Sequence, residues 1–138
     1  MECSDDLQRM DIAMIHRFLS EESSWAKGIP LETLKRGMEH SLCFGGWSDG
    51  RQIAFARVIS DQASFAYLLD VFVLPEFQGH GYSKQLLEFI LRHPALQGLR
   101  RFVLVSSNAR GLYQQFGFQA LGKPETYMEI HRPALYQA

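Results

Sequence analysis

Val71 to Leu87 reads VFVLPEFQGHGYSKQLL, and this stretch decides the fold. It opens as the apolar end of a strand, which Pro75 stops because proline cannot donate to a strand ladder. It closes as a helix over 81–91, where apolar residues recur at helical spacing. Residues 78–83, between the two, are rich in glycine. A helix N-terminus presents unpaired N–H groups and partial positive charge, and glycine lets an anion approach them. The turn is therefore a candidate phosphate cradle.

Other glycine motifs do not fit this turn. A phosphate-binding loop of the G-x-x-x-x-G-K-[ST] type has no match in the chain. A dinucleotide fingerprint needs a third glycine at position 84, which is Lys84. The glycines alone leave a purely structural alternative open, because strand-to-helix turns favour glycine in general.

Hydrophobic periodicity around the turn predicts a mixed α/β domain. A continuous apolar run, RFVLV, is typical of a strand buried on both faces. Asp11 is a predicted helix N-cap. The expected helices are residues 11–19, 31–40, 81–91 and 109–116, and the expected strands are 41–47, 52–60, 64–74, 101–105, 118–121 and 127–131. This order favours a three-layer architecture in a single domain, residues 1–138.

Composition excludes several classes of protein. Lys plus Arg number 14 against 15 for Asp plus Glu, so the chain has no electrostatic footprint for nucleic acid or an anionic membrane. We expect no transmembrane segment and no signal peptide, and therefore a cytoplasmic protein. The five His residues are scattered, so we expect no metal site. Cys43 lies in an apolar stretch and is predicted to be a buried thiol.

The glycine turn resembles the acetyl-CoA signature of the GNAT superfamily, [QR]-x-x-G-x-[GA]. Gln78 and Gly81 match this pattern, while Ser83 stands where Gly or Ala is usual. Further along, ARGLYQQFGF is similar to the family segment A-x-x-[LF]-Y-x-[KR]-x-G-F. The matching residues there are Ala109, Leu112, Tyr113, Gly117 and Phe118, while Gln115 replaces a basic residue and Ser106 stands where the family often has Asn.

This resemblance implies a GNAT-like α/β (α+β) domain, with a mixed central sheet of about six to seven strands flanked by about four helices. It implies acetyl-CoA as cosubstrate, with the diphosphate on the backbone of the turn and the pantetheine arm along the preceding strand. The cofactor-binding residues implied are Phe72, Val73, Gln78, Gly79, His80, Gly81, Tyr82, Ser83, Lys84, Ser106 and Ala109.

Acetyl transfer to an amine needs a deprotonated amine, donors for an oxyanion and a proton for the departing thiolate. By resemblance, Tyr113 is the expected general acid, and the N–H of Val73 is the expected oxyanion donor. Asp70 interrupts an apolar strand, so it is either the general base or one half of a cross-strand ion pair with Arg57. The resemblance also leaves a third reading open, because many GNAT enzymes use a water chain as base; Asp70 would then orient the substrate.

Two aromatic residues, Trp25 and Tyr127, are candidates for an acceptor cleft, whereas Trp47 is predicted to lie in the core. A surface position is predicted for His131. The predicted function is N-acetylation of a primary amine, in a small molecule or a peptide, by direct attack in a ternary complex. The alternatives are a GNAT-like acyl-CoA-binding regulatory module without turnover and an unrelated nucleotide-binding domain. Dimerisation is common in the resembled family, and the sequence leaves the oligomeric state open.

Overall fold

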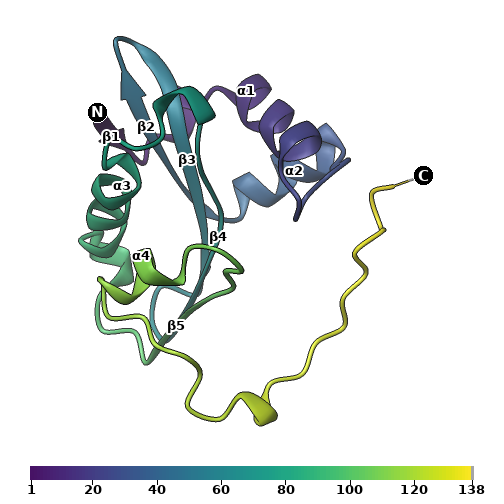
Figure 1. The fold of residues 1–138 in the computed structure, drawn as a ribbon, viewed down its shortest axis with the longest axis vertical. Coiled ribbons are helices and arrows are strands. Elements are labelled where there is room, and N and C mark those ends of the chain that lie inside the picture. Colours follow the sequence, from purple (N-terminus) through teal and green to yellow (C-terminus); the bar gives the residue numbers. More distant parts are fainter. Residues whose placement is uncertain (138) are drawn as a thin grey trace.

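A single mixed sheet organises the chain, as the computed structural model of residues 1–137 shows (Figure 1). The strands lie in the order in which they follow one another along the chain. Neighbouring strands are antiparallel from the first to the fourth, and the last pair is parallel. The strands are β1 (Glu2–Ser4), β2 (Leu42–Ser48), β3 (Arg51–Ser60), β4 (Phe65–Val73) and β5 (Arg101–Leu104).

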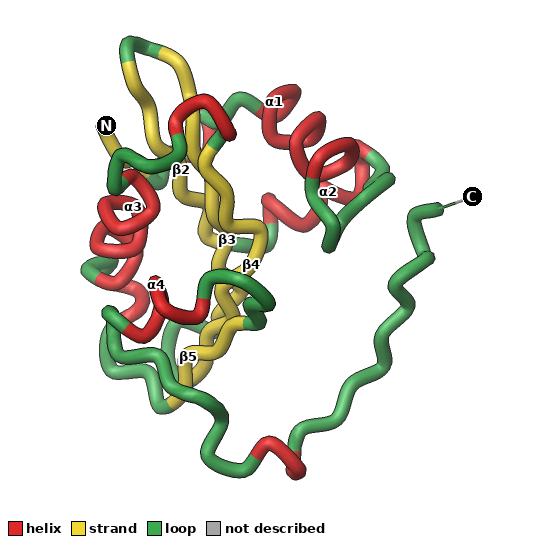
Figure 2. Tube along the Cα trace, viewed as in Figure 1, coloured by secondary structure: helices red, strands yellow, loops and turns green. Residues whose placement is uncertain are grey.

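Helices cover both faces of this sheet and make a three-layer architecture, with α1 and α2 on one face and α3 and α4 on the other (Figure 2). As predicted, the side chain of Asp11 caps α1 by accepting from the N–H of Met14 at 3.1 Å. The helices are α1 (Ile12–Arg17), α2 (Leu31–Glu39), α3 (Tyr82–Leu91) and α4 (Arg110–Gln114), and a π-helical turn, Phe18–Glu22, continues α1. Short 3-10 turns occupy Leu7–Arg9, Pro75–Phe77, Pro94–Leu96 and Pro124–Thr126.

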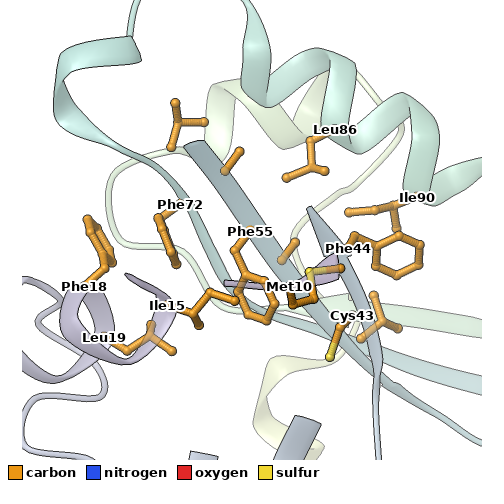
Figure 3. Close-up of a cluster of buried hydrophobic side chains, with 14 of the residues drawn as sticks. Met10, Ile15, Phe18, Leu19, Cys43, Phe44, Phe55, Phe72, Leu86 and Ile90 are labelled. Carbon is orange, nitrogen blue, oxygen red and sulfur yellow. The ribbon is translucent and has the colours of Figure 1, made fainter. Parts of the chain in front are cut away.

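The core lies on both sides of the sheet (Figure 3). On one side Phe18 stacks on Phe72 of β4, with ring centroids 3.9 Å apart. On the other side α3 presents Leu86 and Ile90, which are fully buried. The predicted burial of Cys43 and Trp47 is confirmed, with 3% and 8% of each residue exposed.

A β-bulge interrupts the pairing of β3 with β4. Phe55 pairs with Phe72 and Arg57 pairs with Leu69, so two residues of β4 oppose one residue of β3. One of these two is Asp70, whose φ of +56° lies in the left-handed region. Asp is among the residues that tolerate this conformation best. Bulges of this kind bend a strand and change the direction of the side chains beside them.

β4 and β5 separate part-way along their length. Only residues 65–68 of β4 pair with residues 101–104 of β5. From residue 69 to Val73, β4 continues without β5 beside it. Residues 69–73 therefore have a strand neighbour on the β3 side only.

Three expectations about the C-terminal part of the chain are wrong. Neither 118–121 nor 127–131 forms a strand within the described residues, so the sheet has five strands rather than about six to seven. β5 is consequently an edge strand and only half-buried, not enclosed on both faces. The helix expected over 109–116 is the shorter α4. A strand needs a neighbour that satisfies its backbone, and within the described residues neither 118–121 nor 127–131 pairs with another strand, so β5 keeps an open outer edge. α4 is short because the chain tightens after Gln114, where the N–H groups of Phe116 and Gly117 donate to carbonyls three residues back. Among the described residues, no helix has the length and apolar character to cross a membrane.

Candidate functional site

The glycine turn leads from the end of β4 into α3. Gly79 and Gly81 have φ values of +85° and +78°, and a Cβ built on either would meet nothing within 4 Å. Gly81 is the N-cap of α3 and contributes no side-chain cap. Across residues 1–137, the backbone N–H groups from Gly79 to Lys84 find no backbone acceptor. The turn therefore presents unpaired donors to an open space, as an anion site requires.

Gln78 ties this turn to the strand before it. Its side-chain Nε2 donates to the carbonyl of Val73 at 3.0 Å. The side chain of Gln78 thus positions the turn and leaves anion binding to the backbone. His80 and Lys84 are exposed, and the His80 ring lies 5.6 Å from that of Tyr82.

The end of β4 presents a free backbone edge beside the turn. The N–H of Leu74 donates to the carbonyl of Ile53 on β3 at 2.8 Å. Because successive residues of a strand direct their backbone groups to opposite sides, the N–H of Val73 points away from β3. The Gln78 contact to the Val73 carbonyl lies on that same side. Where β5 has diverged, an extended ligand could pair with β4 along this edge.

Tyr113 lies on α4 and is 8% exposed. Its ring packs edge-on against Phe118, with centroids 6.0 Å apart. Burial raises the pKa of the Tyr113 phenol above its usual value, because the charged form loses solvation. The phenol therefore stays protonated at neutral pH. Ser106 accepts the N–H of Ala109 at 3.0 Å and so shapes the entry into α4.

Asp70 forms a cross-strand ion pair with Arg57, which is one of the alternatives predicted from the sequence. Its carboxylate accepts from Arg57 Nε at 3.0 Å and from Trp25 Nε1 at 2.9 Å. Asp70 is 7% exposed, and the guanidinium also donates to Ser41 Oγ at 2.9 Å. Both carboxylate oxygens are thus engaged in a buried network, which positions Trp25.

The structure brings some predicted site residues together and separates others. Trp25, 53% exposed, lies beside Phe18 and Asp70 on the α1 side of the sheet. Tyr127 lies elsewhere, against Arg101 of β5, so the two aromatic candidates do not share one cleft. His131 is exposed, as predicted. Sequence reasoning missed Ser41, because no local pattern marks a serine that will meet an arginine sixteen residues away.

Metal ligands are not gathered anywhere in residues 1–137, where no group of three His, Cys, Asp or Glu side chains could hold an ion. The groups that this candidate site offers to a ligand are backbone N–H donors, one buried phenol and one buried ion-pair network.

The profile of the Acetyltransferase (GNAT) family matches residues 12–118, which span the glycine turn, the bulged strand and Tyr113. The chain belongs to the GNAT family. It is accordingly an acyltransferase, and acetyl transfer is the general reaction of this family.

Individual relatives agree with this GNAT assignment. A protein from Gibberella zeae, named as an acetyltransferase, is 29% identical over 80% of this chain and 73% of its own length. A crystal structure assigned to the GNAT family, from Xanthomonas campestris pv. campestris, is 55% identical and covers 99% of this chain and 96% of that one, with a TM-score of 0.97. N-acetylglutamate synthase from Neisseria gonorrhoeae, solved with coenzyme A and N-acetyl-glutamate, shares the fold at 22% identity and a TM-score of 0.68, over 90% of this chain and 29% of that one.

Proposed function

We propose that this GNAT protein transfers an acetyl group from acetyl-CoA to a primary amine by direct attack in a ternary complex. The observation that carries the proposal is the pairing of two features. Unpaired N–H groups of the glycine turn lie next to the free edge of β4, and Gln78 joins the two. A long ligand with a diphosphate at one end and amides along its length fits such a surface.

The cofactor-facing groups are assigned from this geometry. The N–H groups from Gly79 to Lys84 would hold the diphosphate, and the exposed ammonium of Lys84 would add positive charge. At the end of β4, Val73 would offer its outward-facing backbone groups to the pantetheine arm, with Phe72 beside it. Ser106 and Ala109, at the entry into α4, would complete the cofactor contacts. Acetyl-CoA supplies the activated thioester acetyl group.

Two groups of the chain would then act on the reacting atoms. The N–H of Val73, directed to the open edge, would donate to the oxyanion that forms on the acetyl carbonyl. Tyr113 would donate its proton to the departing sulfur, and its raised pKa keeps that proton available at neutral pH.

Asp70 is assigned a positioning role rather than that of general base. Its two oxygens already accept from Arg57 and Trp25, so a substrate ammonium would have to compete with a buried ion pair. The proton of the amine would leave through water. Asp70 would instead fix Trp25 at the acceptor side of the sheet, where its exposed ring offers a cation–π surface to an amine.

The test is release of coenzyme A thiol across a panel of small-molecule and peptide amines. We expect Tyr113→Phe to lower kcat with little change in the KM for acetyl-CoA, because the acid acts on the leaving group. Tyr136→Phe is the matched control: it removes the same hydroxyl from a half-buried tyrosine whose backbone carbonyl lies against Gly28. Equal kcat in both variants would remove Tyr113 from the acid role. Binding of acetyl-CoA without thiol release for any amine would support the regulatory module instead.

A further inference from the structure

A one-residue shift in the pairing of β3 with β4 decides which backbone group faces the open edge of β4. Before the bulge Arg57 stands opposite Leu69, and after it the N–H of Leu74 donates to the carbonyl of Ile53 at 2.8 Å. If the register before the bulge continued unbroken, Val73 would stand opposite Ile53 in place of Leu74. The N–H of Val73 would then bond to β3 and leave the open edge. The outward direction of this N–H therefore depends on the bulge.

The bulge contains a residue whose conformation its surroundings must hold. Asp70 has a φ of +56°, and residues other than glycine keep such a left-handed conformation only where neighbouring groups fix it. Asp70 Oδ2 accepts from Arg57 Nε at 3.0 Å, and Arg57 is the last residue of β3 that pairs before the bulge. The pair is buried, with 13% of the Arg57 side chain and 6% of the Asp70 side chain exposed. Because breaking a buried ion pair is strongly unfavourable, this contact holds the bulged residue against β3.

The end of α2 fixes the Arg57 guanidinium from its other side. Arg57 Nη1 donates to Ser41 Oγ at 2.9 Å, and Ser41 Oγ donates to the carbonyl of Gly37 at 2.6 Å. A Cβ built on Gly37, within α2, would lie 3.0 Å from Arg57 Nη1. The absence of a side chain at Gly37 therefore leaves the room that the guanidinium occupies. The planar guanidinium binds Asp70 and Ser41 at the same time, which the point charge of a lysine does not reproduce.

We propose that Arg57, held in place by Ser41 and Gly37, is a positioning residue for acetyl transfer. It acts through Asp70, by fixing the bulge that keeps the N–H of Val73 at the open edge of β4. The inference rests on the proposed function, in which this N–H is the oxyanion donor. The helix α2, on the opposite face of the sheet from α3, thereby influences the reacting centre through one buried ion pair.

Amide hydrogen exchange measured by NMR tests this role without any substrate. In the native chain the N–H of Leu74 should exchange slowly, because it is bonded to the carbonyl of Ile53. The N–H of Val73 should exchange faster, because it faces the open edge. The exchange rates of these two neighbouring amides therefore report the register of β4.

Two variants disturb the guanidinium by different routes, so the test remains decisive if one of them does not fold. Gly37→Ala places a methyl group against Arg57 Nη1, although alanine by itself favours a helix over glycine. Arg57→Lys keeps the charge and loses the planar set of donors. In both variants we expect exchange of the Leu74 N–H to accelerate by about tenfold or more, because local opening of β4 becomes easier. Arg36→Ala is the matched control, since it introduces alanine at the adjoining exposed position of α2 and should leave this rate unchanged. Native exchange of Leu74 in both Gly37→Ala and Arg57→Lys would overturn the proposal.

Release of coenzyme A thiol measures the effect of the bulge on the reaction. In Gly37→Ala and Arg57→Lys kcat should fall by about 10- to 100-fold, because complete loss of one oxyanion donor costs about 100- to 1000-fold and a loosened bulge misplaces the donor only part of the time. The Kd of CoASH should stay near its native value, because the glycine turn, not the bulge, is assigned to the diphosphate.

The kinetic constants separate this role from the other contact of Asp70. A raised KM for the amine with native kcat would mean that the ion pair serves only to orient Trp25, and it would contradict the proposal. A native chain that releases no thiol with any amine would instead contradict the proposed function. The exchange rates would still decide whether Arg57 holds the bulge.

Discussion

Replacing Gly81 with alanine tests two roles of this residue separately. One is its left-handed backbone conformation, which affects folding stability, and the other is its place in the proposed anion site, which affects the affinity for coenzyme A. Gly81 has a φ of +78°, and an added Cβ meets nothing within 4 Å. Without ligand, the only cost of Gly81→Ala is the left-handed conformation, about 1–2 kcal/mol of folding free energy. Gly50, in the turn between β2 and β3, is a close match, with a φ of +77° and equally open space. Gly50→Ala should therefore cost the same.

The two variants should differ once coenzyme A is present. At Gly81 the new methyl group would occupy the space through which the diphosphate approaches the N–H groups of α3. Loss of one hydrogen bond to a charged group corresponds to about 1.5–3 kcal/mol. Because each 1.4 kcal/mol is about tenfold in affinity, the Kd of CoASH should rise by about 10- to 100-fold. Gly50→Ala should leave that Kd unchanged.

Urea denaturation without ligand measures the shared cost, and titration calorimetry with CoASH measures the difference. Equal loss of stability together with a weaker Kd in Gly81→Ala alone is the expected pattern. Indistinguishable Kd values for the two variants would refute the assignment of this turn as the diphosphate site. The comparison is clean because both variants carry the same strain, so misfolding cannot explain a difference in affinity.

Three further perturbations follow from the buried groups. Asp70→Asn should lower the free energy of unfolding in urea by about 3–5 kcal/mol, because it leaves the Arg57 guanidinium buried without its counter-charge. Burial raises the pKa of Cys43 from 9.0 to about 11, so the unfolded chain loses this proton first. Stability should therefore fall between pH 9 and pH 11, by up to about 1.4 kcal/mol per pH unit, and Cys43→Ala should flatten that slope. Phe18→Ala, which removes the 3.9 Å stack on Phe72, should cost about 3–5 kcal/mol in urea, far more than Phe65→Ala at a 41% exposed position.

The part of the fold that could be predicted is the part that neighbouring residues determine. Pro75 ends β4 and a helical stripe begins directly after the glycine turn, so neighbouring residues decide both boundaries. The meander from β2 to β4 is similarly marked by its turns and by runs of apolar residues. The predicted bounds of these elements therefore agree with the structure to within one or two residues.

The bulge at Asp70 was beyond sequence reasoning because it is a property of register. Whether one or two residues of β4 oppose Ala56 depends on where β3 pairs at both ends. Of the two hydrogen-bond partners of Asp70, one could be predicted from the sequence and the other could not. Arg57 could be anticipated because it interrupts a neighbouring strand in the same way, whereas Trp25 reaches Asp70 from a loop whose path no spacing encodes.

The wrong predictions at the C-terminal end have one location and admit one explanation. The sequence predicts that residues 101–105 are enclosed and that 127–131 is a strand, but a single chain has an exposed β5 edge and an extended, bare segment. Alternating apolar and polar residues are compatible with a strand, but a strand forms only where a neighbouring backbone satisfies its N–H and C=O groups. Whether residues 127–131 meet such a neighbour depends on the path of the chain after α4, and local spacing does not encode that path.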